Sequence, residues 1–502
     1  MQRAQFLVGL FCILFCWSCS SSRKSQYSIH QKYPSTELKA DVQILQKILE
    51  ANHPSLYWYT SKEKMDDYFA ETINGITDSL TEIQFRNRIA FLVSQIHCGH
   101  TIVRNSRAFF NSISKNRQPQ FPLAIKTWGD SMVVVANIYS KSKTLKRGTI
   151  LTSINGRSNK ELLDSFFKYI SIDGYNESYK SQIVSNNFGA WYRNIFGVDT
   201  NYLIGYIDSI GNEKKESIKS FLPQALGRTQ TDSLQKLFTT VKIPTKREMR
   251  KARRRSQFSL KFDDSTSTAF MYLSGFSNIG LQKFMRRSFK QLKAKETKNL
   301  VIDLRDNGGG HLNNSIRLTR YLAKHPFKVA DTVAAINRNF AYAKYIQQSF
   351  WFWFPLNFNT TKLEDGRYHY HRFETKRYKP FSNNHFDGNI YLLQGPSTFS
   401  ASTIFTSSLK GQENVLLIGE EAGGGYYGNT AIHMPIIVLP TSKIEITLPL
   451  FRVVLDKDRP KGRGVMPDLL VLPNSYAIKQ GIDLKMQVVK EKIKEKNIST
   501  RL

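Results

Sequence analysis

The stretch Asn299-Leu-Val-Ile-Asp-Leu-Arg-Asp-Asn-Gly-Gly-Gly310 decides the fold of this chain. Its uninterrupted apolar run predicts a strand buried on both faces of a parallel sheet, and the three glycines predict a loop directly after that strand. A second stretch, Gly395-Pro-Ser-Thr-Phe-Ser-Ala-Ser-Thr403, predicts a turn followed by the start of a helix. The first stretch provides bare backbone N–H groups and the second a serine at a helix N-terminus. Acyl-transfer chemistry needs both.

Outward from these stretches, the hydrophobic periodicity alternates between strands and helices. Beyond residue 258 the pattern predicts the following order: strand 269–273, helix 280–295, strand 300–304, helix 312–323, strand 389–393, helix 401–409 and strand 415–418. Such alternation implies βαβ units and an α/β domain. Ahead of it, residues 35–96 show helical spacing, and residues 121–136 show short strands.

Together the two stretches resemble the motifs of the tail-specific, C-terminal-processing and tricorn-like serine peptidases of family S41. The resemblance implies an α/β, crotonase/ClpP-like βαβ catalytic domain with an N-terminal helical segment and a PDZ-like domain. The run from 145 to 169, with its Ile-Asn-Gly turn before a helix, resembles part of a PDZ module. The expected division of the chain is 1–19 signal peptide, 20–36 tether, 37–117 N-terminal helical domain, 118–225 PDZ-like domain, 226–257 basic linker, 258–475 catalytic domain and 476–502 C-terminal helical tail.

Ser400 is the candidate nucleophile. On position alone a serine before a helix is most often an N-cap, because its side chain can accept a hydrogen bond from the first turn. The Ser-Ala-Ser pattern at 400–402 resembles the family's nucleophile motif, in which the first serine attacks, and this leaves Ser402 for capping or packing.

The glycine run is the candidate oxyanion hole. It lacks the Gly-Lys-Ser/Thr ending of a P-loop and the spacing of a dinucleotide fingerprint, so phosphate binding is not indicated. The resemblance implies that the Gly309 N–H and the Ala401 N–H together form the oxyanion hole. The Gly308 N–H is the second choice for the glycine donor. Asp303 and Arg305 are expected to form an ion pair or buried hydrogen bonds at the strand end.

The general base is predicted to be a histidine. Gly425 stands where the tail-specific enzymes have their lysine, and no lysine occurs between Lys410 and Lys443, so a Ser–Lys dyad is absent. The tricorn-like branch uses a histidine instead, and His100 in Cys98-Gly-His-Thr101 matches that element. A neutral imidazole near Ser400 would accept its proton.

Alternatives to this assignment remain open. His100 could instead have a purely structural role, as a histidine that caps or packs at a helix end. As bases, His311 ranks second and His97 also competes. The group that orients His100 is unassigned among three carboxylates, a backbone carbonyl and water. The carboxylates are Asp456, Asp458 and Glu420.

The N-terminus predicts export. An apolar run at 6–17 leads to Cys19, which resembles the lipidated cysteine of a bacterial lipoprotein signal; a plain membrane anchor is the alternative. Either way we expect the body to lie in the cell envelope, periplasmic or held at the outer or inner membrane. The mature chain would keep only Cys19 and Cys98, so no disulfide framework or zinc spacing exists. The net charge is +32, and a basic block stands out at 246–255, which we interpret as a solvated linker.

The sequence thus predicts an exported serine endopeptidase that hydrolyses peptide bonds through an acyl-enzyme on Ser400. The implied mechanism needs no metal or cofactor, and the expected partners are a polypeptide substrate and, through the N-terminal lipid, a membrane, but no nucleic acid. Two alternatives stand beside it. One is an inactive protein of the same fold that binds peptides or apolar ligands in the cleft. The other is an enoyl-hydratase-like enzyme, although no feature that would anchor coenzyme A is evident.

Overall fold

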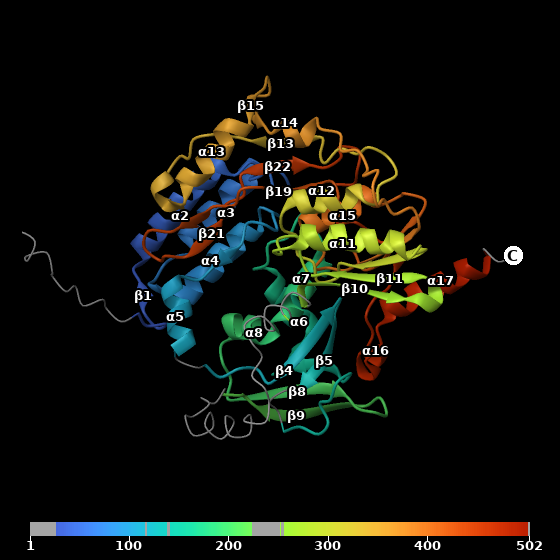
Figure 1. Ribbon diagram of the computed structural model, residues 1–502. Helices are drawn as coiled ribbons and strands as arrows, with labels where there is room; N and C mark the ends of the chain where they lie inside the picture. Colours follow the sequence, from blue (N-terminus) through green and yellow to red (C-terminus); the bar gives the residue numbers. More distant parts are fainter. Residues whose placement is uncertain (1–26, 116–117, 138–140, 223–251, 253–255, 500–502) are drawn as a thin grey trace, which may run out of the picture.

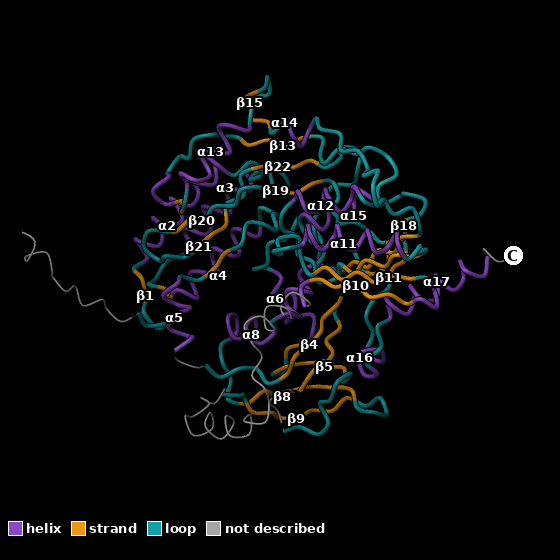
Figure 2. The backbone as a smooth tube through the Cα atoms, in the orientation of Figure 1, coloured by secondary structure: helices purple, strands orange, loops and turns teal. Residues whose placement is uncertain are grey.

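The computed structural model of the protein describes residues 27–115, 118–137, 141–222, 252 and 256–499 (Figure 1). The predicted signal segment with Cys19 and most of the basic linker lie outside the described residues. Helices and strands are mixed along the chain (Figure 2), which confirms the predicted α/β class. The PDZ-like character of 118–225 stays a prediction.

A six-stranded sheet carries the two decisive stretches. Its strands lie in the order β10 (Phe258–Asp263), β11 (Thr268–Leu273), β12 (Asn299–Asp303), β17 (Asn389–Gln394), β18 (Val415–Gly419) and β23 (Leu469–Leu470). Strands β10 and β11 pair antiparallel, and every later pair is parallel. Because β12 and β17 are parallel neighbours with Asn299 opposite Asn389, their carboxyl ends lie at one edge of the sheet. This edge brings the glycine loop to Ser400.

Both faces of this sheet are covered, which explains why β12 is apolar without alternation. Leu300 and Ile302 face one core together with the helices α11 (Leu281–Ala294), α12 (Leu312–Arg320) and α15 (Ala401–Leu409). Val301 faces a second, smaller core, to which α17 (Leu484–Ser499) contributes. The short helix α16 (Ser475–Gln480) precedes α17. The helices and strands predicted between 269 and 418 are confirmed, with boundary shifts of a few residues.

Two further sheets lie beside this layer. The five-stranded sheet has the order β15 (Thr361–Lys362), β16 (Tyr368–His369), β13 (Thr332–Ala335), β22 (Phe451–Val454) and β19 (Gly428–Ala431). The four-stranded sheet has the order β14 (Ile346–Gln347), β20 (Ile436–Val438), β21 (Glu445–Thr447) and β3 (Val103–Arg104). Helices α13 (Ser349–Asn359) and α14 (His371–Glu374) and two 3₁₀ turns (Asp264–Thr266 and Ala343–Tyr345) complete this half of the chain.

The N-terminal helices do not enclose a core of their own. They are α2 (Ser35–Asn52), α3 (Lys62–Asn74), α4 (Glu82–Ser94) and α5 (Arg107–Lys115). Strand β1 (Lys32–Tyr33) precedes α2, and its partner β2 (Leu80–Thr81) lies between α3 and α4. Apolar residues of these helices, such as Leu45 and Phe85, share one core with Val333, Ile437 and Phe451 from the two smaller sheets. This shared core holds the loop of His100 against the C-terminal half of the chain.

Residues 121–219 form a separate layer with its own core. The strands are β4 (Leu123–Trp128), β5 (Ser131–Asn137), β6 (Ile150–Ile154), β8 (Asn201–Ile207) and β9 (Glu213–Lys219), and β7 (Arg157–Ser158) pairs with β6. Helices α6 (Asn159–Phe167), α7 (Glu177–Asn186) and α8 (Phe188–Phe196) cover the sheet (Figure 1). The segment between α6 and α7 leaves this layer and reaches the candidate site.

Asp41 ties α2 to the turn between β20 and β21. Its buried carboxylate accepts hydrogen bonds from the Thr441 N–H (3.0 Å), the Ser442 N–H (2.9 Å) and the Ser442 hydroxyl (2.7 Å). These bonds join segments 400 residues apart in the chain, and the sequence gives no sign of them.

We predict that Asp41→Ala destabilises the protein by about 3 kcal/mol, because three donors lose their acceptor in a buried place. Urea unfolding followed by circular dichroism measures the change. The control Asp67→Ala removes an exposed carboxylate from α3 and should stay within about 0.5 kcal/mol of the parent. Equal losses in the two variants would contradict the role given to Asp41.

Candidate active site

Ser400 has a strained backbone. Its φ is 55° and its ψ −124°. Residues other than glycine rarely adopt this conformation, which costs about 1–3 kcal/mol. Neighbouring bonds hold this conformation, since the Thr398 hydroxyl donates to the Leu304 carbonyl (2.9 Å) and the Phe399 N–H donates to the Asn307 carbonyl (3.2 Å). The Ser400 side chain makes no capping hydrogen bond to α15. The Ser400 side chain is therefore available for a role other than helix capping.

The glycine loop touches the Ser400 turn. Gly309 has a φ of +98°, and a Cβ on it would lie 2.7 Å from the Ser400 Cβ and 3.0 Å from the Ala401 nitrogen. Only glycine allows this approach. The Gly309 N–H donates to the Asn307 Oδ1 at 3.0 Å, whereas the N–H groups of Ala401 and Gly308 have no acceptor among the described residues.

The ring of His100 packs against the ring of Phe399. Its buried ring is 4.6 Å from the Phe399 ring between centroids, and neither ring nitrogen has a hydrogen-bond partner among the described residues. Burial lowers the pKa of His100 to about 4, because the charged imidazolium loses its hydration. The imidazole is thus neutral at pH 7 and able to accept a proton. The His100 ring contacts Phe399, the residue before Ser400, and makes no hydrogen bond to Ser400.

Asp173 connects the His100 loop with the glycines at 423–425. Its Oδ1 accepts the Gly99 N–H (2.8 Å) and its Oδ2 accepts the Gly425 N–H (3.3 Å). Burial raises the pKa of Asp173 to about 7, although these two hydrogen bonds act in the opposite direction. Sequence reasoning missed Asp173, because the bond depends on the path of the chain between α6 and α7.

The two departures from the family's motifs have a steric basis. A Cβ on Gly99, where the tricorn-like enzymes have a serine, would lie 2.8 Å from the Phe399 ring. A Cβ on Gly425, where the tail-specific enzymes have lysine, would lie 2.1 Å from the Gly428 carbonyl oxygen. With this backbone neither position accepts a side chain.

The competing histidines lie differently. The His97 Nδ1 shares a hydrogen bond with the Gly174 carbonyl (2.8 Å), and its ring packs on Tyr175, which gives it a structural role. His311 precedes α12 and lines the same cavity as Ser400.

None of the carboxylates considered as orienting groups contacts His100. Glu420 pairs with Lys485, and Asp456 pairs with Arg459 at 3.1 Å. The Asp458 N–H donates to the Asp456 carboxylate. Asp303 and Arg305 form the predicted ion pair, at 2.7 Å.

Ser400 and Ala401 line a cavity of about 360 Å³. Its walls are mainly apolar and come from α12, α14, α15 and the five-stranded sheet. They include Leu312, Val333, Phe373, Ile404, Ala431 and Val453.

Two polar side chains in this cavity were missed from the sequence. Asn429 on β19 is buried, and neither its oxygen nor its nitrogen has a partner among the described residues. The His433 Nε2 is likewise buried without a partner, and burial lowers the pKa of this histidine. Unpartnered buried polar atoms in the cavity that Ser400 lines are available to a bound molecule.

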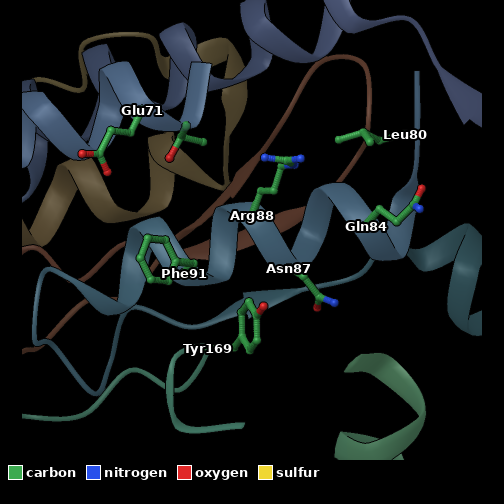
Figure 3. Close-up of a pocket in the computed structure, with 8 residues that line it drawn as sticks. Glu71, Leu80, Gln84, Asn87, Arg88, Phe91 and Tyr169 are labelled. Atoms are coloured by element: carbon green, nitrogen blue, oxygen red, sulfur yellow. The ribbon is translucent and has the colours of Figure 1, made fainter. Parts of the chain in front are cut away.

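A larger pocket, of about 530 Å³, lies along α4 (Figure 3). Its wall includes Glu71, Arg88, Phe91 and Tyr169. Ser400 does not line this larger pocket, whereas Ser400, Ala401 and His311 line the smaller cavity, which is therefore the candidate active site. Within the described ranges, no three His, Cys, Asp or Glu side chains are placed to hold a metal ion.

One family model and several solved structures are similar to this chain. The sequence model of peptidase family S41 matches residues 267–471. The crystal structure of mature CPAF aligns with 89% of this chain and 94% of its own, with a TM-score of 0.59 and 12% identity. Mature CPAF complexed with lactacystin aligns with 92% of this chain and 99% of its own, with the same score and identity. These likenesses show a common fold.

A putative peptidase from Parabacteroides merdae ATCC 43184 aligns with 92% of this chain and 97% of its own, at a TM-score of 0.45 and 12% identity. A search of the curated proteins found no match. The matched residues 267–471 include the glycine loop, Ser400 and the cavity strands. Through them, this part of the chain is similar to peptidase family S41.

Proposed function

We propose that this chain is an exported serine endopeptidase that hydrolyses polypeptides through an acyl-enzyme on Ser400, as in the tricorn-like branch of its family. One observation carries the proposal. Ser400 is held in a strained conformation at the start of α15, with its side chain uncapped and the Ala401 N–H free beside the cavity. This is the arrangement that acyl transfer requires of a nucleophile and an oxyanion donor.

In the proposed reaction, the Ser400 Oγ attacks the carbonyl carbon of the scissile peptide, and His100 takes the hydroxyl proton. His100 then gives this proton to the leaving amine, which departs and leaves an ester on Ser400. Water, deprotonated by His100, hydrolyses the ester, and the proton returns to Ser400. Each step conserves atoms and protons between Ser400, His100 and water.

The oxyanion is assigned to the Ala401 N–H and one glycine N–H. Gly309, with Gly308 next in line, is the assigned partner. Since the Gly309 N–H donates to the Asn307 side chain in the free protein, it must leave this acceptor when the oxyanion forms. The Gly308 N–H has no acceptor to leave.

His100 acts as the base by virtue of being neutral and unpartnered. Its ring lies against Phe399, whose peptide leads directly to Ser400. Catalytic hydrogen bonds are often long in free enzymes and tighten when the substrate binds. The Asp173 carboxylate accepts a hydrogen bond from the N–H of Gly99, the residue before His100, and so positions this loop.

The cavity supports an apolar side chain of the substrate beside the scissile bond. Its walls carry Leu312, Val333, Phe373 and Ile404. The amide of Asn429 supplies a donor and an acceptor, which match the two polar groups of a peptide. Export and anchoring through Cys19 remain part of the proposal, because that segment lies outside the described residues.

We predict that a fluorophosphonate probe labels the protein and that Ser400→Ala abolishes the labelling. His100→Ala should slow it by roughly 10²–10⁴-fold, the usual contribution of a general base. Mass spectrometry of the labelled peptide and the labelling rate measure the two effects. The controls Ser408→Ala, later on α15, and His371→Ala, on α14, should label like the parent.

Two outcomes of that experiment would contradict the assignment. Loss of labelling in Ser400→Ala alone would exclude His100 as the base and direct attention to His311 in the cavity wall. A folded parent that is not labelled would favour a protein that binds peptides without cleaving them.

We also predict the pH dependence of labelling. His100 must be neutral to accept a proton, so the rate should fall as the pH drops through the His100 pKa of about 4. A base with an ordinary histidine pKa would instead lose activity around pH 6.5. The rate is measured from pH 3.5 to 8, with circular dichroism at each pH to confirm that the protein stays folded.

Asp173 titrates in the same range, with a pKa of about 7, and it contacts the His100 loop through Gly99. A step near pH 7 that disappears in Asp173→Asn belongs to this carboxyl group. A main loss centred near pH 6.5 that survives in Asp173→Asn would contradict the buried, neutral state of His100.

A further inference from the structure

A pocket of about 430 Å³ is lined by α12 and by residues 372–379. Among its lining side chains are six with a positive charge and none with a negative charge, so we name it the basic pocket. The six cations are Arg317, Arg320, Arg372, Lys376, Arg377 and Lys379. Gln282 and Asn313 add neutral polar groups to the wall. Like charges gathered in this way repel one another unless an anion neutralises them.

The chain itself does not supply that anion. In the part of the chain that the structure describes, no carboxylate lies within ion-pair distance of any of the six cations. Residues 281–295, which include α11, contain no aspartate or glutamate, and neither do residues 307–330, which include α12.

The carboxylate nearest in sequence is engaged elsewhere. Glu374 lies on α14, but it accepts a hydrogen bond from the Val333 N–H (2.6 Å) and pairs with His369 (2.8 Å). None of the other acidic residues between 300 and 415 lines the pocket, and most of them pair with a basic residue outside it. They are Asp303, Asp306, Asp331, Glu364, Asp365, Asp387 and Glu413.

Aromatic rings and a backbone carbonyl hold the cations instead. The Arg320 guanidinium carbon lies 3.9 Å from the centre of the Phe381 ring, and the Arg320 Nε donates to the Lys379 carbonyl at 2.7 Å. The Lys376 ammonium lies 5.3 Å from the centre of the Tyr378 ring. Such contacts restrain a cationic side chain without cancelling its charge. The basic pocket is therefore prepared for an anion from outside the chain.

We propose that the basic pocket binds a ligand with clustered phosphate groups. Four of the six cations are arginines, whose planar guanidinium donates two parallel hydrogen bonds to phosphate oxygens. Six positive charges around about 430 Å³ favour a ligand that carries several negative charges in a small volume. A phosphomonoester carries about 1.5–2 negative charges at pH 7. An acidic peptide carries only one charge for the volume of each whole residue, so it suits this pocket less well.

The basic pocket is distinct from the catalytic cavity. Leu312 and Phe373 line the cavity beside Ser400, whereas their neighbours Asn313 and Arg372 line the basic pocket. The two sites thus lie on different sides of α12 and α14. Ligand binding in the basic pocket does not depend on the activity proposed for Ser400.

Calorimetric titration with sodium tripolyphosphate tests this site. The full chain, with Cys19→Ser to prevent lipidation, is titrated in about 150 mM NaCl, which screens charges separated by more than about 8 Å. It should bind one tripolyphosphate, and Lys376→Gln/Arg377→Gln should weaken the binding by roughly tenfold or more, because charge-assisted hydrogen bonds are lost. Circular dichroism confirms that both proteins are folded. The absence of saturable binding by the folded parent would overturn the proposal.

A matched control separates the pocket from the overall positive charge. Lys490→Gln/Lys494→Gln removes the same charge from exposed positions of α17. This helix packs on the opposite face of the six-stranded sheet from α12. The control should change the affinity for tripolyphosphate less than twofold. Equal weakening in the two double variants would show attraction to the whole protein and would overturn the pocket.

Competition identifies the source of the phosphate groups. Vesicles of phosphatidylcholine with phosphatidic acid carry them on a lipid headgroup. Vesicle binding that tripolyphosphate displaces, and that Lys376→Gln/Arg377→Gln loses, would support a headgroup as the ligand. If tripolyphosphate binds in the pocket and the vesicles do not, a soluble phosphorylated ligand is supported. Oligoglutamate that binds as tightly as tripolyphosphate, with the same loss in Lys376→Gln/Arg377→Gln, would assign the pocket to acidic polypeptides and overturn the proposal.

Discussion

The contact between Gly309 and the Ser400 turn is the constraint on which the candidate site depends. The Cα of Gly309 lies so close to Ser400 and Ala401 that a single added Cβ would overlap them. This proximity follows from the parallel pairing of β12 and β17, because the loops after both strands leave the sheet at the same edge. The strained φ of Ser400 is tolerated there because hydrogen bonds from Thr398 and Phe399 to the loop after β12 hold the residues that precede it. Sheet pairing, the glycine and the strained serine thus form one unit.

The rest of the chain supplies the remaining parts of the site by long-range packing. The N-terminal helices share their core with the two smaller sheets, and this shared core fixes the position of the His100 loop. Asp173 comes from a third region and bonds Gly99 and Gly425, so one buried carboxyl group joins three distant segments. Burial has opposite effects on the two groups. It lowers the pKa of His100 and raises that of Asp173, and both effects favour the neutral form.

Helix α13, on which Phe350, Trp351, Trp353, Phe354 and Phe358 are exposed, is connected to the same region. Phe352, on the inward face of α13, lies 5.9 Å from the ring of His433, which lines the cavity beside Ser400. One helix therefore has an apolar face in the core next to the cavity and a second apolar face at the surface. Proteins rarely expose so many large rings on one helix.

The sequence by itself determined the class of the fold, the strand before the glycines, the helix after Ser400 and the absence of a lysine at position 425. These features depend on local periodicity and on residue type, both of which a single sequence contains. It also singled out Ser400, Gly309 and His100 through a family resemblance, and the structure places all three around one turn.

The tertiary structure alone decided which other groups surround the serine. Asp173, Asn429 and His433 lie in short or irregular segments. The two glycines that Asp173 bonds are 74 and 252 residues away, and the Asn429 side chain has no partner among the described residues, so no local pattern marks these groups. Likewise, a run of aromatic residues at 350–358 is compatible with a core helix or a surface helix. Only the packing of Phe352 and Leu356 shows which face is buried and leaves the other five rings exposed. Burial is a property of the whole fold, and the pKa values, free N–H groups and exposed surfaces that it creates appear only when distant segments meet.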